Sequence, residues 1–383
     1  MSKLKELIQE LCPNGVEYKK LGDVVTIKRG IRVVKSQLSE NGKYPVYQNS
    51  LTPLGFYEKS NVEENTTFII VAGAAGEIGY SCVDFWAADD CFYFSCGENI
   101  LNKYIYYVLM RNKPTLLSKV RKASIPRLSR LAIEQLMIPV PPLPVQREIV
   151  QILDNFTELI TELTTELTAR KKQYEYYRDS LLTSVKNNTS MCTLRNIVKK
   201  SCSGATPAKG NLDYYINGTI PWIRTQDVRF NEITSVDSYI TEKAVLETGA
   251  KWIPENCVIV AISGATAGRC AVNKIKATTN QHCLNLEIDE SKALYKYVYY
   301  CIYSKYEELL NRKQGARGDL NSSLILSLEI PVPSLDIQRR LVRILDHFEE
   351  ICSDLNYGLP AEIEARQKQY EYYRDKLLTF EHT

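Results

Sequence analysis

The sequence has little of what marks several classes of protein. It contains only three histidines and three tryptophans among 383 residues, and its eleven cysteines form no Cys-x-x-Cys pair. Neither a zinc cluster nor a secreted disulfide framework is therefore indicated, and most cysteines are expected to be reduced core thiols. No apolar run approaches the ~20 residues that cross a bilayer, and no signal-peptide pattern is visible. We expect a cytoplasmic protein without a membrane partner.

Excess charge and catalytic motifs are also scarce. The formal net charge is only +3, so nucleic-acid binding would have to come from local basic clusters. The glycine-rich segments 73–79 and 264–268 lack the Lys-Ser/Thr ending of a phosphate-binding loop, and 73–79 is followed by strand-like sequence, which predicts turns between strands. No histidine pairs in sequence with a plausible Ser or Cys nucleophile, so hydrolytic triads are unsupported, and no Asn/Asp-Pro-Pro-aromatic motif occurs. The sequence predicts no catalysis, no metal site and no cofactor in this chain.

What the chain does contain is a duplication. Residues 138–147 (IPVPPLPVQR) return as residues 330–339 (IPVPSLDIQR), 192 positions later. Residues 172–179 (KQYEYYRD) return unchanged as residues 368–375, 196 positions later, so the second copy has gained four residues. The globular parts upstream match only loosely. Nearly identical repeats predict one kind of partner bound twice, whereas divergent globular parts predict two different targets.

Each globular half is expected to be mainly β. Short β-branched runs such as 24–27, broken by Gly, Asn and Pro, favour strands. A short helix is expected on each Lys-Tyr-x-Tyr-Tyr run, at 103–107 and 296–300. The prolines within 139–144 and 331–333 are incompatible with a helix interior, so they predict a stiff hinge after which a helix begins.

The segments after the prolines have the apolar spacing of coiled-coil helices, in steps of four and three. Within 161–168 the tetrapeptide Thr-Glu-Leu-Thr occurs twice and inserts an extra turn. The second helix carries Gly358 and Pro360, where a kink or break is expected. Two such helices of roughly 60 Å, packed antiparallel, would hold the globular domains apart. Dimerisation of the helices with another copy is the alternative.

Binding chemistry is expected from basic stretches and from loops with amide, Arg and Asp side chains. Basic side chains neutralise phosphates, and loop side chains of these kinds read base edges. For any single basic stretch, a solvated charged face is the alternative. The candidate nucleic-acid-binding residues are Lys28, Arg29, Arg32, Tyr47, Gln48, Asn49, Lys122, Arg127, Arg130, Arg224, Gln226, Asp227, Asn280, Gln281, Arg312, Lys313 and Arg317.

The order of these elements resembles the specificity subunit of type I restriction-modification enzymes over essentially the whole chain. The resemblance rests on the paired segments 138–154 with 172–183 and 330–346 with 368–379, while the globular halves match mainly in layout. It implies an α+β fold in which two mainly β target recognition domains are each followed by a long helix. The two helices would pair as an antiparallel coiled coil with pseudo-twofold symmetry. The implied divisions are an N-terminal helix at 1–17, recognition domains at 18–142 and 191–333, a central helix at 143–190 and a C-terminal helix at 334–383.

The resemblance also implies partners. Each recognition domain would read one half of a split sequence in double-stranded DNA, and the number of tetrapeptide repeats would set the length of the unread spacer. Two methyltransferase subunits that bind S-adenosylmethionine would dock on the helices, and restriction subunits would join them. The candidate partner-binding residues are Gln146, Arg147, Tyr174, Tyr177, Arg178, Gln338, Arg339, Tyr370, Tyr373 and Arg374.

Two other readings of the sequence stay open at this point. One is the recognition part of a single-chain DNA modification enzyme, which methylation by the purified chain with S-adenosylmethionine would reveal. The other is a coiled-coil scaffold with carbohydrate- or protein-binding β domains. Binding to duplex DNA in the presence of a methyltransferase partner separates that scaffold from a specificity subunit.

Overall fold

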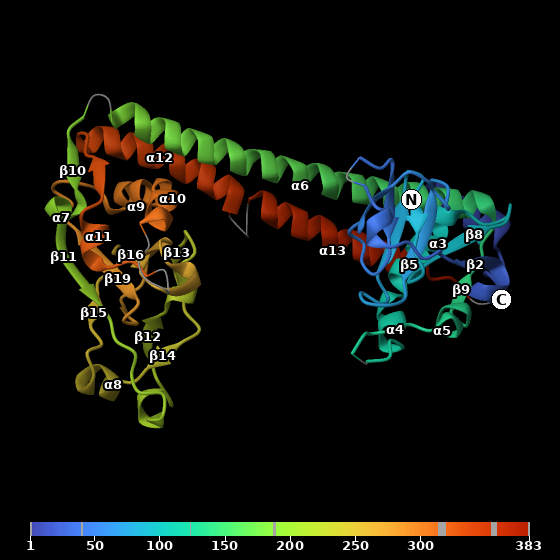
Figure 1. The fold of residues 1–383 in the computed structure, drawn as a ribbon, viewed down its shortest axis with the longest axis horizontal. Helices are drawn as coiled ribbons and strands as arrows, with labels where there is room; N and C mark the ends of the chain where they lie inside the picture. The colour runs from blue at the N-terminus through green and yellow to red at the C-terminus, as the bar shows by residue number, and fades with distance from the viewer. Residues whose placement is uncertain are drawn as a thin grey trace. The chain divides into compact units, whose positions relative to one another are not determined.

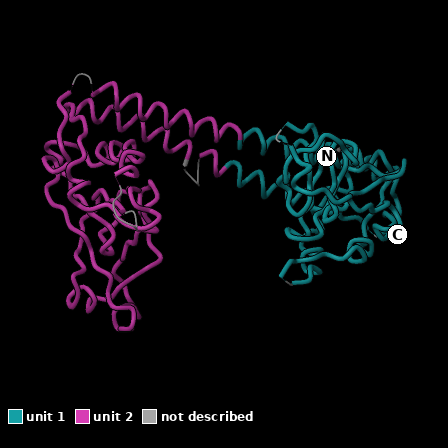
Figure 2. Tube along the Cα trace, in the orientation of Figure 1, with its two compact units in different colours: residues 1–164, 362–383 teal, residues 165–361 magenta. Residues whose placement is uncertain are grey.

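The structure is a computed structural model that describes residues 2–39, 41–122, 124–186, 189–312, 319–353 and 358–381. The candidates Lys313 and Arg317 lie outside the described residues. The chain divides into two compact units (Figure 2). Unit 1 consists of Met1–Thr164 and Glu362–Thr383, and unit 2 of Thr165–Ala361. Both units combine sheets with helices, so the predicted α+β fold class is confirmed.

Unit 1 contains two main sheets and a short ladder. The sheet of order β2-β8-β5-β6 is antiparallel throughout, whereas β3 and β7 run parallel in the sheet of order β4-β3-β7. Its strands are β1 (Tyr18–Lys20), β2 (Val25–Arg29), β3 (Tyr44–Tyr47), β4 (Gly55–Tyr57), β5 (Thr66–Ile70), β6 (Ile78–Ser81), β7 (Trp86–Ala87), β8 (Cys91–Cys96) and β9 (Met137–Pro139). Its helices upstream of the long helix are α1 (Ser2–Leu11), α2 (Leu21–Val24), the 3-10 turn η1 (Lys35–Gln37), α3 (Asn102–Arg111), α4 (Lys113–Ser118) and α5 (Arg130–Glu134).

Unit 2 repeats this plan with more strands. Its sheets have the orders β11-β19-β16-β17-β13 and β14-β12-β18-β15. The strands are β10 (Met191–Thr193), β11 (Val198–Ser203), β12 (Ile220–Ile223), β13 (Glu232–Ile233), β14 (Tyr239–Ile240), β15 (Trp252–Ile253), β16 (Val258–Ala261), β17 (Cys270–Asn273), β18 (Ala277–Thr279), β19 (Cys283–Ile288) and β20 (Glu329–Pro331). The helices are α7 (Leu194–Ile197), α8 (Glu242–Glu247), α9 (Tyr295–Ser304), α10 (Tyr306–Asn311) and α11 (Ser322–Leu326), with 3-10 turns η2 (Leu212–Tyr214), η3 (Thr225–Asp227) and η4 (Gly264–Thr266).

The central strands show why each unit has a hydrophobic core on both faces of its main sheet. Because side chains alternate along a strand, β5 sends Ile69 into the core shared with α3 and sends Phe68 and Ile70 into a second core on the other face. In unit 2, β16 divides Val258 and Val260 from Ile259 and Ala261 in the same way. The runs Lys-Tyr-x-Tyr-Tyr form α3 and α9 as predicted, with Tyr104, Tyr107, Tyr297 and Tyr300 fully buried.

The glycine-rich segments are turns between antiparallel strands, as the sequence predicts. Residues 71–77 connect β5 to β6, and residues 262–269 connect β16 to β17. Gly73 and Gly76 have φ angles of +82° and +94°, and Gly264 and Gly268 have +71° and +92°. These left-handed conformations favour glycine, which explains the glycine pair in each copy without any nucleotide.

The long helices supply parts to both units. Helix α6 (Leu143–Lys186) passes from unit 1 to unit 2 between Thr164 and Thr165, the junction of the two Thr-Glu-Leu-Thr copies. Helix α12 (Leu335–Ser353) belongs to unit 2, and α13 (Leu359–Leu377) belongs mostly to unit 1. The predicted break is borne out at Gly358, which lies in a bend directly before α13 begins at Leu359. Pro360 lies in the first turn of α13, where a missing N–H costs no helical bond.

Each unit packs one end of α6 against a helix from the C-terminal copy (Figure 1). In unit 1 the rings of Phe156 and Tyr373 stack with centroids 5.4 Å apart. In unit 2 the rings of Tyr177 and Phe348 stack at 5.7 Å. The cysteines are all free, and seven of the eleven are buried, in agreement with the prediction of core thiols. Among the described helices, none is both long and apolar enough to cross a membrane.

Candidate nucleic-acid interface

A buried glutamine fixes each domain to its long helix. Gln146 accepts a hydrogen bond from the backbone N–H of Leu101 (3.0 Å) and donates to the carbonyls of Asn99 (3.0 Å) and Pro141 (2.7 Å). Gln338 makes the matching three bonds, to Leu294 N–H (2.8 Å), Lys292 O (3.3 Å) and Pro333 O (2.8 Å). Both side chains are fully buried. Gln146 and Gln338 were predicted as partner contacts, and this burial corrects that prediction.

The proline segments are held by strand pairing and by tyrosine hydroxyls. Pro139 pairs with Tyr18 in the β1–β9 ladder, and Pro331 pairs with Met191 in the β10–β20 ladder. The hydroxyl of Tyr104 donates to Pro139 O at 3.1 Å, and that of Tyr297 donates to Pro331 O at 2.8 Å. The globular domain and the start of its helix are therefore joined by hydrogen bonds in each unit, as a stiff boundary requires.

The other partner candidates divide into buried and exposed sets. Tyr174, Tyr370 and Arg178 are each less than 7% exposed, because Arg178 lies over the ring of Tyr303 at 4.2 Å and the tyrosines pack in the unit cores. These three are corrections to the predicted contact face. Arg147, Tyr177 and Arg339 are exposed, and Tyr373 and Arg374 are half-buried.

Two exposed tyrosines were missed by the sequence reasoning. Tyr176 is 69% exposed and Tyr372 is 60% exposed, at the same position of the KQYEYYRD repeat. Both lie beside the apolar seam, one residue before its last tyrosine. An unchanged repeat outside the seam was the available signal, since packing within the chain does not require it.

In unit 1 the ends of two parallel strands form what we call the unit 1 corner, residues 29–32, 47–49 and 88–90. The N–H of Ala88 donates to Tyr47 O (2.9 Å), and the indole N–H of Trp86 donates to Ile31 O (2.7 Å). Gly30 lies so close to the next strand that a Cβ there would be 2.2 Å from Ala88 O. The backbone of the corner is therefore tightly fixed.

Unit 2 builds the same corner from residues 203–206, 223–227 and 280–282. The N–H of Asn280 donates to Ile223 O (3.0 Å), and the indole N–H of Trp222 donates to Ala205 O (3.1 Å). A Cβ on Gly204 would be 1.8 Å from Thr279 O. Five predicted candidates lie in each corner. They are Arg224, Gln226, Asp227, Asn280 and Gln281 in unit 2, and Arg29, Arg32, Tyr47, Gln48 and Asn49 in unit 1.

Not all of these candidates present a side chain to a ligand. Tyr47 stacks on Phe68 at 4.6 Å, and burial raises the pKa of its hydroxyl. Asn280 is 8% exposed and accepts from the N–H of His282, and Asp227 accepts from the N–H of Arg224 at 2.8 Å. These three side chains hold the corner in shape, and Asn280 also lines the open pocket of unit 2. Their role as base contacts stays a prediction. Arg224 and Gln281 line the same pocket, of about 780 Å³, with Trp222.

A basic loop lies beside the unit 1 corner. Arg121 and Arg127 exchange two backbone hydrogen bonds, of 2.8 and 3.2 Å, and the loop is bound to the glycine turn by Gly73 N–H to Pro126 O at 3.2 Å. The next turn residue, Ala74, donates to Asn49 O at 2.9 Å. The structure thus brings Lys122 and Arg127, both exposed, into the neighbourhood of Asn49.

The remaining candidates lie apart from the corners or are paired. Lys28 lines a separate hollow with Asn61 and Glu63. Arg130 forms an ion pair with Glu134 at 2.7 Å, and Arg312 forms one with Glu308. A paired, partly exposed cation contributes less positive potential than an unpaired one, so these residues are weaker phosphate contacts than predicted.

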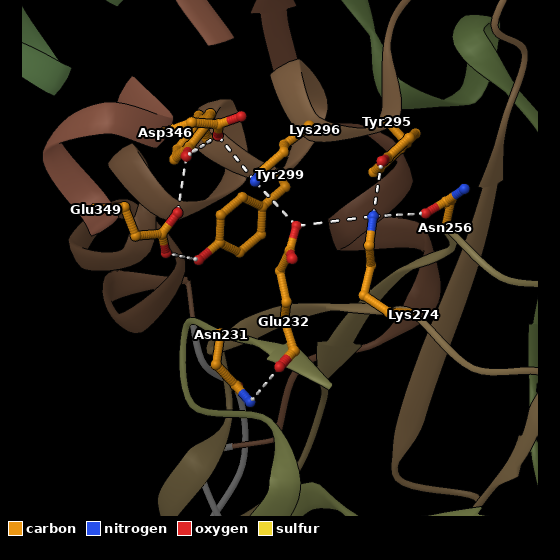
Figure 3. Close-up of polar contacts among 10 residues, drawn as sticks. Asn231, Glu232, Asn256, Lys274, Tyr295, Lys296, Tyr299, Asp346 and Glu349 are labelled. Carbon is orange, nitrogen blue, oxygen red and sulfur yellow. Dashed lines mark hydrogen bonds and ion pairs between the residues drawn. The ribbon is translucent and has the colours of Figure 1, made fainter. Parts of the chain in front are cut away.

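A polar network joins the unit 2 domain to α12 (Figure 3). Lys296 lies between Glu232 and Asp346, with N–O distances of 2.9 Å to each. Glu349 accepts from the hydroxyls of Tyr299 (3.1 Å) and Tyr300 (2.7 Å), and burial raises the pKa of its carboxyl. In unit 1 the network is smaller, because Lys103 contacts Asp154 at 2.8 Å and Thr157 occupies the position of Glu349.

Comparison with known proteins gives consistent matches along the chain. A family model described as "Type I restriction modification DNA specificity domain" matches residues 13–171 and again 187–365. The type I restriction enzyme EcoR124I/EcoR124II specificity subunit of Escherichia coli is 39% identical over 300 residues, covering 75% of this chain and 73% of that protein. A putative type I restriction enzyme specificity subunit of Haemophilus influenzae is 30% identical over 390 residues, covering 95% of this chain and 96% of that protein.

Solved structures share the fold at low sequence identity. The type I restriction-modification system S subunit from M. genitalium superposes with a TM-score of 0.63 at 17% identity, covering 97% of this chain and 98% of that chain. A chain from a study of complex assembly and conformational transition of the type I R-M system gives a TM-score of 0.61 at 14% identity, covering 96% and 98%.

Proposed function

Because this chain belongs to the type I restriction-modification DNA specificity family, in which it is a non-catalytic specificity subunit, we propose that it reads a split DNA target and docks methyltransferase subunits. Each unit contacts one half of the target. The methyltransferase subunits carry S-adenosylmethionine and modify the DNA, and restriction subunits join the same complex. The observation that carries this proposal is the duplicated corner, one per unit, with different side chains on the same backbone.

The DNA-binding part of the proposal is supported by the groups around the corners. Lys122 and Arg127 are exposed next to the unit 1 corner, and Arg224 lines the open pocket of unit 2. Arg and Lys side chains contact phosphates, whereas Arg and amide side chains read base edges in the major groove. The two corners supply both kinds of group within each unit.

The partner-docking part is supported by side chains that the fold leaves unused. Tyr176 and Tyr372 expose most of their rings at repeated positions, although tyrosine is a residue that interfaces usually bury. Their repetition fits one kind of subunit bound once per copy. The proposed docking residues are Arg147, Tyr176, Tyr177, Arg339, Tyr372, Tyr373 and Arg374.

Exchange of one domain tests this function directly. Residues 18–137 would be replaced by the corresponding domain of another specificity subunit, and the chain would be expressed with its methyltransferase. Sequencing of modified bases in those cells should show one half-site changed and the other retained. A methylated motif that does not change at all would contradict the proposal.

Salt dependence tests the DNA contact separately. The logarithm of the binding constant of the complex with methyltransferase should fall with the logarithm of salt concentration, by about 0.9 for each phosphate contacted. The isolated chain with S-adenosylmethionine provides the control and should methylate nothing. A flat salt response would argue against phosphate contacts, and methylation by the isolated chain would favour the single-chain enzyme.

A further inference from the structure

The two corners share a backbone and differ in the side chains that they present. Tyr47 is paired with Ala87 in parallel register, and Ile223 is paired with Thr279 in the same way. The next residue after the first strand is therefore Gln48 in unit 1 and Arg224 in unit 2. Two residues after the second strand stand Asp89 and Gln281. These positions are equivalent by strand register, without reference to side-chain similarity.

The residues that hold the corners are alike, whereas the presented residues are not. Each corner has a glycine with no space for a Cβ and an indole N–H bonded to the residue that follows this glycine. The indole comes from the second strand of the pair in unit 1 (Trp86) and from the first strand in unit 2 (Trp222). The presented positions carry an amide and a carboxylate in unit 1, but a guanidinium and an amide in unit 2. A fixed backbone that displays exchanged hydrogen-bonding groups is what two readers of different sequences require.

An unpaired polar atom lies at each corner. In the described part of the chain, Asp89 Oδ1 and Arg224 Nε are both buried without a hydrogen-bond partner. Arg29 bonds the backbone carbonyl of Asp89 at 2.9 Å and leaves that carboxylate oxygen unused. A buried polar group without a partner costs free energy, so a ligand that supplies the partner gains affinity. Asp89 Oδ1 lacks a donor and Arg224 Nε lacks an acceptor, and both residues are half-buried.

The chemistry of these groups selects bases. The Arg224 guanidinium lies over the indole of Trp222, with 5.8 Å between its central carbon and the ring centroid, at the wall of the open pocket. Such a stacked guanidinium presents a planar pair of donors, which matches O6 and N7 of guanine. A carboxylate accepts from the exocyclic amino group of cytosine. Asp89 was not among the residues predicted from the sequence.

We propose that Arg224 contacts a guanine in the half-site of unit 2 and that Asp89 contacts a cytosine in the half-site of unit 1. This inference rests on the proposed function, because it assigns bases to the two halves of the same target. Gln48 and Gln281 complete the two corners as neighbouring amide contacts. The corners thereby determine which sequence is read. The basic loop beside the unit 1 corner contributes only to the affinity for DNA.

The test uses the complete chain with its methyltransferase partner. Arg224→Gln should lower the affinity for the target duplex by roughly 10- to 100-fold and remove the requirement for one guanine in one half-site. Arg224→Lys keeps the positive charge but loses the planar pair of donors, so it should lower the affinity by a smaller factor at the same base. Asp89→Asn should relax a cytosine in the other half-site. Affinities would be measured on duplexes substituted one base pair at a time, alongside sequencing of modified bases.

Arg229→Gln is the matched control. Arg229 is exposed, does not line the pocket, and donates to Gln226 O at 2.6 Å. The substitution removes the same charge five residues from Arg224, and it should change affinity equally for all duplexes. Melting temperatures of all variants, compared with the wild type, identify any that fail to fold. If Arg224→Gln does not fold, the base preference of Arg224→Lys tests the guanine contact instead.

The outcomes separate the inference from the proposed function. A split motif in the wild type that loses one guanine requirement with Arg224→Gln supports both. A split motif that Arg224→Gln and Asp89→Asn leave unchanged overturns the base assignment, while the specificity function stands. A wild-type complex that binds or methylates DNA without any sequence preference overturns the proposed function and the base assignment together.

Discussion

The two units attach their domains to the helices with one shared contact and one that has diverged. Gln146 and Gln338 make the same three hydrogen bonds in the two copies. Around them, unit 2 has the network of Lys296, Asp346 and Glu349. In unit 1 the Lys103 ammonium and the Tyr107 hydroxyl contact Asp154, and Thr157 stands at the position of Glu349. The polar side chains around the junction differ between the two copies, whereas the buried amide is the same. Because the glutamine side chain is fully buried in each copy, water cannot replace its hydrogen bonds.

Removing the amide should give the largest effect, and an equal one in the two units. Gln146→Leu should destabilise unit 1, and Gln338→Leu unit 2, by about 2–4 kcal/mol each, because three buried backbone groups lose their partners. Hydrogen–deuterium exchange of peptides from each unit during denaturant titration measures this. Arg147→Leu, at the exposed neighbouring position, should change stability by less than about 0.5 kcal/mol. If only one of the two substitutions destabilised its unit, the two glutamines would not be equivalent.

The corner glycines should give the next largest effect. A Cβ at Gly30 or Gly204 would overlap a backbone carbonyl oxygen, at 2.2 and 1.8 Å, so each Gly→Ala substitution should destabilise its own unit by about 1–3 kcal/mol. Gly97→Ala and Gly210→Ala are the controls, since nothing lies within 4 Å of a Cβ at either position. Thermal unfolding, monitored by hydrogen–deuterium exchange of peptides from each unit, would show the loss of stability. If both corner substitutions left stability unchanged, the corners would not be as closely packed as the structure indicates.

Glu349 predicts a difference between the units in their response to pH. Burial raises the pKa of this carboxyl above its ordinary 4.5, so the stability that it contributes in protonated form is lost as pH rises through the raised pKa. The hydroxyls of Tyr300 and Tyr299 and the charge of Lys296 oppose that shift, and Asp346 adds to it. Unit 2 should therefore lose stability relative to unit 1 as pH rises above about 4.5.

Glu349→Gln should remove this loss, while Glu350→Gln, at the exposed adjacent position, should preserve it. Urea titrations of each unit across the acidic to neutral range measure the difference. Unit 1, with Thr157 at the matching position, serves as the internal reference. A parallel pH dependence of the two units would show that Glu349 makes no distinction between them.

The smallest effect on either unit should follow deletion of residues 165–168. This tetrapeptide starts where unit 2 begins, and most of its side chains are exposed, so both units should retain their stability within about 0.5 kcal/mol. The helix becomes ~6 Å shorter, and the spacer of the methylated motif should shorten while both half-sites stay the same. Replacing the tetrapeptide with Ala-Ala-Leu-Ala preserves length and should preserve the spacer. A changed half-site in the deletion variant would contradict the idea that the tetrapeptide sets only the spacer length.

Local patterns predicted the elements that depend on local chemistry. The glycine pairs predicted turns between strands because only glycine readily adopts positive φ, and Pro360 predicted the break between α12 and α13. The repeated prolines correctly indicated where α6 and α12 begin. A proline marks where a helix cannot continue, but it does not show that β1 or β10 will pair with the segment and hold it.

Side-chain roles were harder to predict than elements. The glutamines, Tyr174, Tyr370 and Arg178 looked like partner contacts because they recur in both copies, and repetition alone does not distinguish a shared internal contact from a shared external one. Asp89 was missed because its sequence neighbourhood is ordinary. Its proposed role rests on β7 lying parallel to β3, so that Asp89 and Gln48 follow the ends of two paired strands although they are 41 residues apart in the sequence.

The sequence by itself determined the duplication, the turns and the helices, since these follow from periodicity and from the backbone preferences of glycine and proline. The α+β class followed from the resemblance to a family. The sequence also determined the family through the repeated segments. Tertiary structure alone decided which repeated polar residues are buried and which face solvent, and which loop residues meet at the corners. The physical reason is that burial and long-range strand register depend on the packing of distant segments, and no local pattern encodes them.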